Sequence, residues 1–167
     1  MRVFQEEQRF TQTWLVIIMA ISILVPIGLI IREFTQDGTN MSTIEFVSTL
    51  LLMLVFTTAI FFFKLKTRID EKGIHYRFFP FHGKFRTIHW SEIKSASIRK
   101  YDAISEYGGW GLKGGFRRKK GRAFNVSGNI GIQLELISNK KILIGTQKEY
   151  DAQRVLETYQ NKIEDHE

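Results

Sequence analysis

Two apolar runs of about 18 residues each, Trp14–Ile31 and Phe46–Phe63, constrain this chain more than any other feature of its sequence. Each run is long enough to cross a bilayer as a helix, at ~1.5 Å per residue against ~30 Å of hydrocarbon. A short polar segment, residues 32–45, separates them. We therefore expect a transmembrane helical hairpin, preceded by an N-terminal segment at 1–13 and followed by one compact domain at 64–167.

Basic residues at the ends of the runs predict the orientation of this hairpin. The segment between the runs contributes Arg32, whereas four basic residues closely follow the second run: Lys64, Lys66, Arg68 and Lys72. The positive-inside rule places both termini in the cytoplasm and the loop at 32–45 outside. A cleaved signal peptide is the alternative for the first run. However, the segment before the run is charge-balanced, and the run exceeds the ~7–15 residues of a signal-peptide core, so we expect a permanent helix.

Beyond the second run the hydrophobic period changes to two, which is typical of half-buried strands. Leu65, Thr67 and Ile69 alternate with charged residues, and the Asp70–Gly73 turn leads into a partner strand. Further strands are predicted at 85–90, 93–101, 132–136 and 142–144. Thr146 and Glu149 have the spacing of a capping box, and the helix that follows has an apolar stripe: Val155, Leu156, Tyr159 and Ile163. The pattern predicts about seven antiparallel strands closed by a C-terminal helix.

This order of elements resembles a pleckstrin-homology-like (PH-like) domain. The resemblance rests on three segments, Ile69–Ile74, Ile88–Ile93 and Ile142–Gln147, the last of which runs into the helix. The whole chain looks like bacterial membrane proteins that have such a domain behind a pair of transmembrane helices. The resemblance implies an inner-membrane location, a bent antiparallel sheet plugged by the helix, and a binding or scaffolding role without catalytic residues. The glycine-rich segment Gly108–Gly111 departs from that pattern.

The strongest candidate binding site is a basic cluster in the glycine-rich part of the domain. Its residues, together with a neighbouring tryptophan, are Trp110, Lys113, Arg117, Arg118, Lys119, Lys120 and Arg122. Clusters of 4–8 Lys and Arg near the cytoplasmic face attract anionic lipid, at ~1 kcal/mol per residue. A solvated charged loop is the alternative. Trp110 can reach lipid, another subunit or the domain's own core, and the role of the Gly108–Gly115 segment stays open. Nucleic acid is not expected as a partner, because Phe116 and Phe124 form no stacking motif.

No motif in the sequence indicates a reaction or a bound cofactor. The glycine spacing fits neither a phosphate loop nor a dinucleotide fingerprint. His75, His82 and His89 are expected to be surface histidines rather than metal ligands, and Asp70 and Glu71 to be exposed acids in a turn. We expect four aromatic side chains to fill the sheet interior: Tyr76, Phe78, Phe85 and Trp90.

Together these features predict a membrane-anchored, non-enzymatic binding or scaffolding module. It would recognise anionic lipid headgroups or an acidic protein partner at the cytoplasmic membrane face. The alternative is an accessory subunit of a larger transporter or membrane-enzyme complex. Small residues give the second helix a packing surface, which consists of Ser48, Thr49, Thr57, Thr58 and Ala59. We therefore expect a homo-oligomer or a membrane-protein partner.

Overall fold

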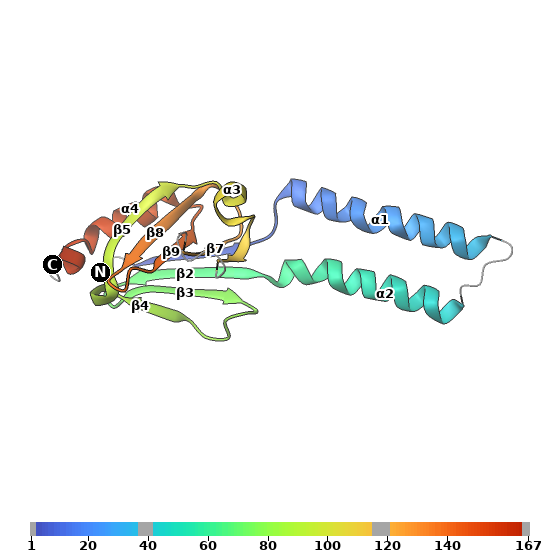
Figure 1. Cartoon of the computed structure of the whole chain (residues 1–167), viewed down its shortest axis with the longest axis horizontal. Helices are drawn as coiled ribbons and strands as arrows, with labels where there is room; N and C mark the ends of the chain where they lie inside the picture. Colours follow the sequence, from blue (N-terminus) through green and yellow to red (C-terminus); the bar gives the residue numbers. More distant parts are fainter. Residues whose placement is uncertain (1–2, 37–41, 115–120, 165–167) are drawn as a thin grey trace. The chain divides into compact units, whose positions relative to one another are not determined.

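A computed structural model of the chain describes residues 3–36, 42–114 and 121–164. The chain divides into two compact units (Figure 1). The helical unit is Phe10–Phe63. The β unit combines Met1–Arg9 with Lys64–Glu167. The N-terminal segment thus belongs to the β unit, from which it is separated in sequence by the whole helical unit.

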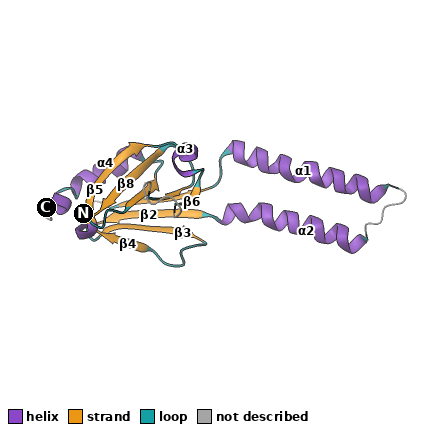
Figure 2. Ribbon diagram, viewed as in Figure 1, coloured by secondary structure: helices purple, strands orange, loops and turns teal. Residues whose placement is uncertain are grey.

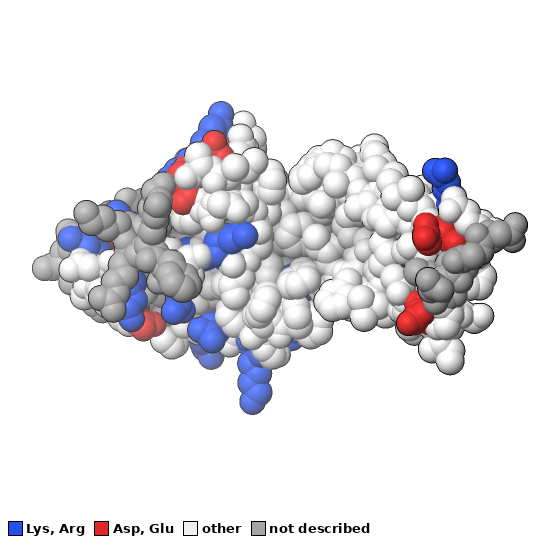
Figure 3. All heavy atoms as spheres, turned by 45° about the vertical axis from the view of Figure 1, so that its right-hand side comes forward, with Lys and Arg blue, Asp and Glu red and all other residues white. Residues whose placement is uncertain are grey.

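The helical unit is a hairpin, as the two apolar runs predict. Its elements are α1 (Thr13–Thr35), α2 (Thr43–Ala59) and the 3₁₀ turn η1 (Ile60–Phe62). Thr13–Thr35 and Thr43–Phe62 are both long and apolar enough to span a membrane. None of the residues in the two helices is buried, and their surface is uncharged over most of its length (Figure 3). This pattern is that of helices whose outer surface faces an apolar medium.

Aromatic pairs lie at both ends of the hairpin, one between α1 and α2 and one between the residues that flank them. Phe34 stacks on Phe46 with ring centroids 4.5 Å apart, and Phe10 meets Phe63 edge-on at 6.3 Å. The Ser42 side chain and Glu45 form a capping box that fixes the start of α2. Ser48, Thr57 and Thr58, expected to form a packing surface, direct their hydroxyl groups to carbonyls of their own helix.

The β unit contains two sheets (Figure 2). Sheet A has the order β1-β2-β3-β4, and every pair in it is antiparallel. Its strands are β1 (Phe4–Arg9), β2 (Lys64–Asp70), β3 (Gly73–Phe79) and β4 (Arg86–His89). The strand β1 was not predicted. Its residues alternate strictly between buried and exposed, but five of the six are polar or charged, so they carry no apolar period-two signal.

Sheet B has the order β5-β8-β9-β7-β6. Its strands are β5 (Ile93–Lys100), β6 (Gly111–Lys113), β7 (Arg122–Asn125), β8 (Ile130–Leu136) and β9 (Lys141–Gly145). The prediction of about seven antiparallel strands within 64–167 is confirmed in part, since the domain is mainly β and mostly antiparallel. The described residues form nine strands, however, and β7 runs parallel to β9. The physical reason is that the glycine-rich segment supplies a hairpin, β6–β7, and β9 lies between β7 and β8, which are consecutive in sequence.

Short helices complete the β unit: η2 (Trp90–Glu92), α3 (Ala103–Tyr107), α4 (Glu149–Thr158) and α5 (Asn161–Glu164). The predicted stripe of the C-terminal helix is confirmed for Val155, Leu156 and Tyr159, which are buried. Its fourth residue, Ile163, is half-buried and lies in the separate helix α5. Tyr159 stacks on Trp90 with ring centroids 5.3 Å apart, and the Trp90 indole donates a hydrogen bond to the Asp70 carbonyl. Each such buried large side chain contributes roughly 1.5–3 kcal/mol.

The predicted capping box at the start of α4 is wrong. The Thr146 hydroxyl donates to Glu6 Oε2 at 2.7 Å, and Glu6 Oε1 accepts from the Gln147 amide at 2.8 Å. The Thr146 hydroxyl accepts from the amide of Lys148 rather than from that of Glu149. The Thr146 amide, which the local motif assigned to the Glu149 carboxylate, donates to the Ile130 carbonyl at 2.9 Å instead. The carboxylate at this site therefore comes from β1, remote in sequence, and binds the Thr146 hydroxyl and the Gln147 amide.

Candidate functional site

The predicted site residue Trp110 is half-buried and lies against the β unit's own core. Its indole packs against a buried cluster and donates a hydrogen bond to the Gly128 carbonyl at 3.2 Å. The cluster consists of Tyr101, Ala103, Ala123 and Leu143. Of the three neighbours that the sequence left open, the one that the indole contacts is the domain's own core. This contact favours a structural role for Trp110.

The basic cluster is described only at its margins. Lys113 is the last residue of β6, where it pairs with Ala123, and Arg122 is the exposed first residue of β7. Arg117, Arg118, Lys119 and Lys120 lie outside the described residues. Other basic side chains of the β unit are described in full.

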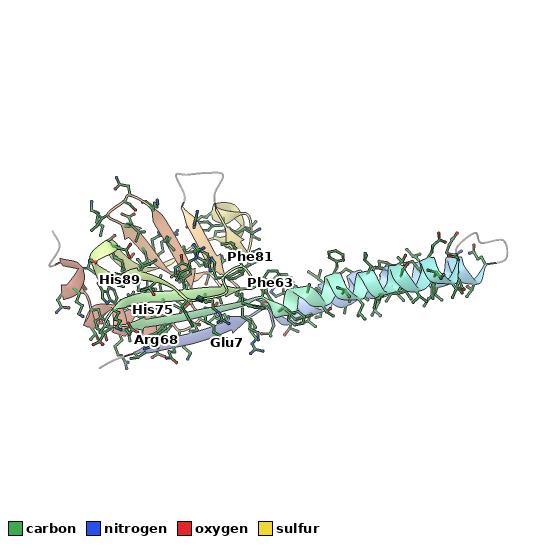
Figure 4. All side chains as sticks on the ribbon, turned by 90° about the horizontal axis from the view of Figure 1, so that it is seen from below. Glu7, Phe63, Arg68, His75, Phe81 and His89 are labelled. Atoms are coloured by element: carbon green, nitrogen blue, oxygen red, sulfur yellow. The ribbon has the colours of Figure 1, made fainter. Side chains whose placement is uncertain are left out.

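A second basic surface lies on the outer face of sheet A. It consists of Arg9, Lys64, Lys66, Arg68 and Arg77, which we call the basic face. Figure 4 shows this sheet with Glu7, Arg68, His75 and His89 labelled on its four strands. The alternation of Lys66 and Arg68 with apolar residues was visible in the sequence. The contribution of Arg9 was not, because it depends on β1 joining the sheet.

The strand register arranges the outer face in cross-strand rows. We call the end where the chain leaves β1 and enters β2 the hairpin end of the sheet. From that end, the rows are Arg9–Lys64–Phe79, Glu7–Lys66–Arg77, Gln5–Arg68–His75–Thr87 and Asp70–Gly73–His89. The formal charge declines along this series, from two cations in the first row to an acid in the last. The positive charge of the outer face is therefore concentrated near the hairpin end.

Ion pairs neutralise part of the basic face. Glu7 binds both Arg9, at 2.5 Å, and Lys66, at 2.6 Å, and Arg68 pairs with Asp70 at 3.0 Å. The hydrogen bond from Lys66, and then that from Arg9, lowers the pKa of Glu7 to about 2. Lys64 and Arg77 form no ion pair with any described residue. These two cations remain available to an external anion.

A groove of about 740 Å³ runs beside the basic face. It is lined by residues of β1, β2 and β3, by Phe85, and by Gln147 and Lys148 at the start of α4. The Arg77 guanidinium lies over the Phe85 ring, 5.8 Å from its centroid. A cation held against an apolar ring suits an amphipathic ligand with a negative head.

A chain of three polar side chains crosses the sheet beyond the groove. His75 Nε2 lies 3.0 Å from Asp70 Oδ1, and His75 Nδ1 lies 2.8 Å from the Thr87 hydroxyl. Burial alone would raise the pKa of Asp70, but hydrogen bonds from His75 and from the Lys72 amide lower it, helped by the charges of His75 and Arg68. The expectation of an exposed acid at Asp70 was wrong, since it is buried. None of Asp70, His75 and Thr87 lines the groove, and the chain acts as a cross-strand tie between β2, β3 and β4.

His82 corrects the expectation of three surface histidines. The ring is buried against Tyr76 and Phe124, and its Nδ1 accepts a hydrogen bond from the Phe78 amide at 3.3 Å. Burial, and then the charges of Arg86 and Arg122, lower its pKa. The lowered pKa favours the neutral imidazole of His82. Within the described segments, no group of three or more His, Asp or Glu side chains could hold a metal ion.

Phe85 departs from its predicted place in the core. Its ring is 46% exposed, whereas Tyr76, Phe78 and Trp90 are buried as expected. Phe85 immediately precedes β4, outside the strand register that the sequence pattern assigned to it.

Comparison of the chain with protein-family models, curated proteins and solved structures gave no match.

Proposed function

We propose that this chain is a membrane-anchored, non-enzymatic binding module of a bacterial inner membrane. Its β unit recognises anionic lipid headgroups at the cytoplasmic face. The observation that carries the proposal is the concentration of unpaired positive charge at the end of sheet A where the chain enters and leaves the apolar helices. Lys64 and Arg77 are the two cations without an ion pair there, among the described residues.

The pairing of β1 with β2 supports a transmembrane hairpin whose two helices begin and end on the same side of the membrane. Arg9 and Lys64 are direct partners in the antiparallel ladder, and all of α1 and α2 lies between them in sequence. If both helices cross a bilayer, the start of α1 and the end of α2 must therefore lie on the same side of it. Cleavage of the first run as a signal peptide would also remove β1, including the Glu6 and Gln8 hydrogen bonds to residues 145–147. A permanent two-helix anchor fits this topology.

The charge distribution supports a cytoplasmic β unit. Basic residues of β1 and β2 adjoin the ends of the hairpin, whereas Arg32 is the basic residue next to the intervening loop. An anionic leaflet attracts basic side chains at its surface by ~1 kcal/mol each. Because the basic face is tethered to the membrane by the helices, its residues would meet lipid headgroups at a high effective concentration.

A PH-like relationship belongs to the same proposal. Two sheets of mostly antiparallel strands, followed by the helix α4 against a shared core, support it. Two features depart from the expected pattern. The helical hairpin is inserted between the first two strands, and β7 is parallel to β9.

The experiment requires a soluble form of the β unit that keeps β1. Because Arg9 and Lys64 are paired, an Asn-Gly turn in place of residues 10–63 would join the two strands directly. We call this the hairpin-replaced variant. Once circular dichroism and cooperative unfolding establish that it folds, its binding to neutral and anionic vesicles is measured over a salt series.

We expect binding that requires anionic lipid and weakens with salt. A Lys64→Ala/Lys66→Ala/Arg77→Ala variant should lose about 3 kcal/mol, or about a hundredfold in affinity. The matched control removes three exposed lysines remote from the hairpin end of the sheet, Lys72, Lys94 and Lys140. Equal losses in both variants would show only a net-charge effect, and absence of binding to anionic vesicles would refute lipid recognition. Salt-sensitive binding to acidic peptides but not to vesicles would instead identify a protein partner.

A further inference from the structure

Three phenylalanines are exposed in and beside the loop that joins β3 to β4. Phe79, Phe81 and Phe85 are 37%, 59% and 46% exposed. Lys84 and Arg86 in the same segment are also exposed. Exposed aromatic side chains close to basic ones occur in segments that lie at a membrane–water interface.

The strand register fixes where this loop lies in the β unit. Phe79 pairs with Lys64, the first residue of β2. Lys64 follows the apolar helical segment in sequence without a linker. Because β3 runs antiparallel to β2, the chain reaches the hairpin end of sheet A at Phe79, and residues 80–85 turn back there toward β4. The loop therefore begins level with the residue at which the chain emerges from its second apolar helix.

Internal contacts hold the loop in a defined shape. The His82 amide donates to the Phe78 carbonyl at 2.8 Å, and the Phe78 amide donates to His82 Nδ1. The Phe81 ring stacks on Phe78 with centroids 6.0 Å apart. His82 thus anchors the loop in the core. A loop fixed in this way presents its exposed rings with little ordering cost on binding.

We propose that the segment Phe79–Arg86 is an interfacial membrane contact. Its phenylalanine rings lie at the boundary between headgroups and acyl chains, and Lys84 and Arg86 bind lipid phosphates. The inference rests on the proposed membrane anchorage, and it adds an apolar contact that does not require anionic lipid. The loop would fix the orientation of the β unit on the bilayer, so that the basic face meets the headgroups.

The test uses the full chain in lipid nanodiscs. The chain has no cysteine, so a single Phe81→Cys substitution can be labelled with an environment-sensitive fluorophore. The matched control is Ile137→Cys, since Ile137 is 57% exposed and its amide bonds to Glu92, remote from the hairpin end of the sheet. We expect blue-shifted emission at position 81, quenched by nitroxides on shallow acyl positions and shielded from aqueous iodide. Position 137 should remain water-like.

Neutral and anionic nanodiscs separate this inference from the proposed function. Insertion at position 81 in both lipids supports the loop contact, even if the hairpin-replaced variant fails to bind anionic vesicles. Water-like emission at position 81, equal to that at 137, overturns the loop contact and leaves salt-sensitive lipid binding intact. If Phe81→Cys fails to fold, Phe85→Cys supplies the same readout, with the same two outcomes.

Discussion

The substitution of Glu6 tests most directly whether the N-terminal segment is part of the β unit. Glu6 is a buried carboxylate on β1, and both of its oxygens accept hydrogen bonds at the start of α4. Glu7, the next residue, points to the opposite face of the sheet and forms exposed ion pairs. The same substitution at these two positions therefore compares the stability contributed by buried hydrogen bonds with that contributed by exposed ion pairs.

The expected cost follows from these contacts. A hydrogen bond to a charged group contributes ~1.5–3 kcal/mol, and Glu6→Ala removes two. The Thr146 hydroxyl, 2% exposed, is left without this acceptor, whereas water can reach the exposed Gln147. We expect a loss of about 3 kcal/mol in the free energy of unfolding, against the ~5–15 kcal/mol typical of a domain. Glu6→Gln keeps one acceptor oxygen, so its cost should be ~1.5–3 kcal/mol. Glu7→Gln should cost at most ~1 kcal/mol.

Urea unfolding of the hairpin-replaced variant, followed by tryptophan fluorescence, measures these differences. A loss of 3 kcal/mol shifts the urea midpoint by about 1–3 M, since the slope for small proteins is ~1–3 kcal/mol per M. In the full chain, Glu6→Gln should also accelerate hydrogen exchange of the Gln147 amide. Equal effects at Glu6 and Glu7 would refute the docking of β1 against α4, and so would stability unchanged by Glu6→Ala.

Three further predictions concern the β unit. Gly73→Ala should destabilise the protein by more than ~1–3 kcal/mol, because φ is +148° and the new Cβ would lie 2.1 Å from the Ile88 carbonyl oxygen. Thermal unfolding measures the loss, and Gly83→Ala, at a position with open space around it, is the control. The lowered pKa of Asp70 contributes stability that is fully present above its unfolded-state pKa and is lost as pH falls through the folded-state value, so Asp70→Asn should flatten the acid limb of a stability–pH curve. Trp110→Phe should lower stability by ~0.5–1.5 kcal/mol through loss of its hydrogen bond, and leave vesicle binding unchanged; weaker binding at equal stability would restore a ligand role for the indole.

Local sequence signals predicted the elements whose formation depends on near neighbours. The two apolar runs predicted the hairpin, because the length and hydropathy of a helical span are properties of one continuous segment. The Asp70–Gly73 turn was predicted from its composition, and Gly73 adopts the positive φ that the turn requires. The stripe at Val155, Leu156 and Tyr159 predicted the buried face of the C-terminal helix.

The tertiary structure decided the features that depend on remote partners. Phe4–Arg9 has no apolar period, and it becomes a strand because β2 supplies its ladder and the start of α4 supplies donors for Glu6. The parallel pairing of β7 with β9 likewise joins segments that no local pattern relates. Hydrophobic periodicity reports how a segment divides between water and an apolar environment. It does not report which remote segment provides the partner for a buried carboxylate or for a strand edge.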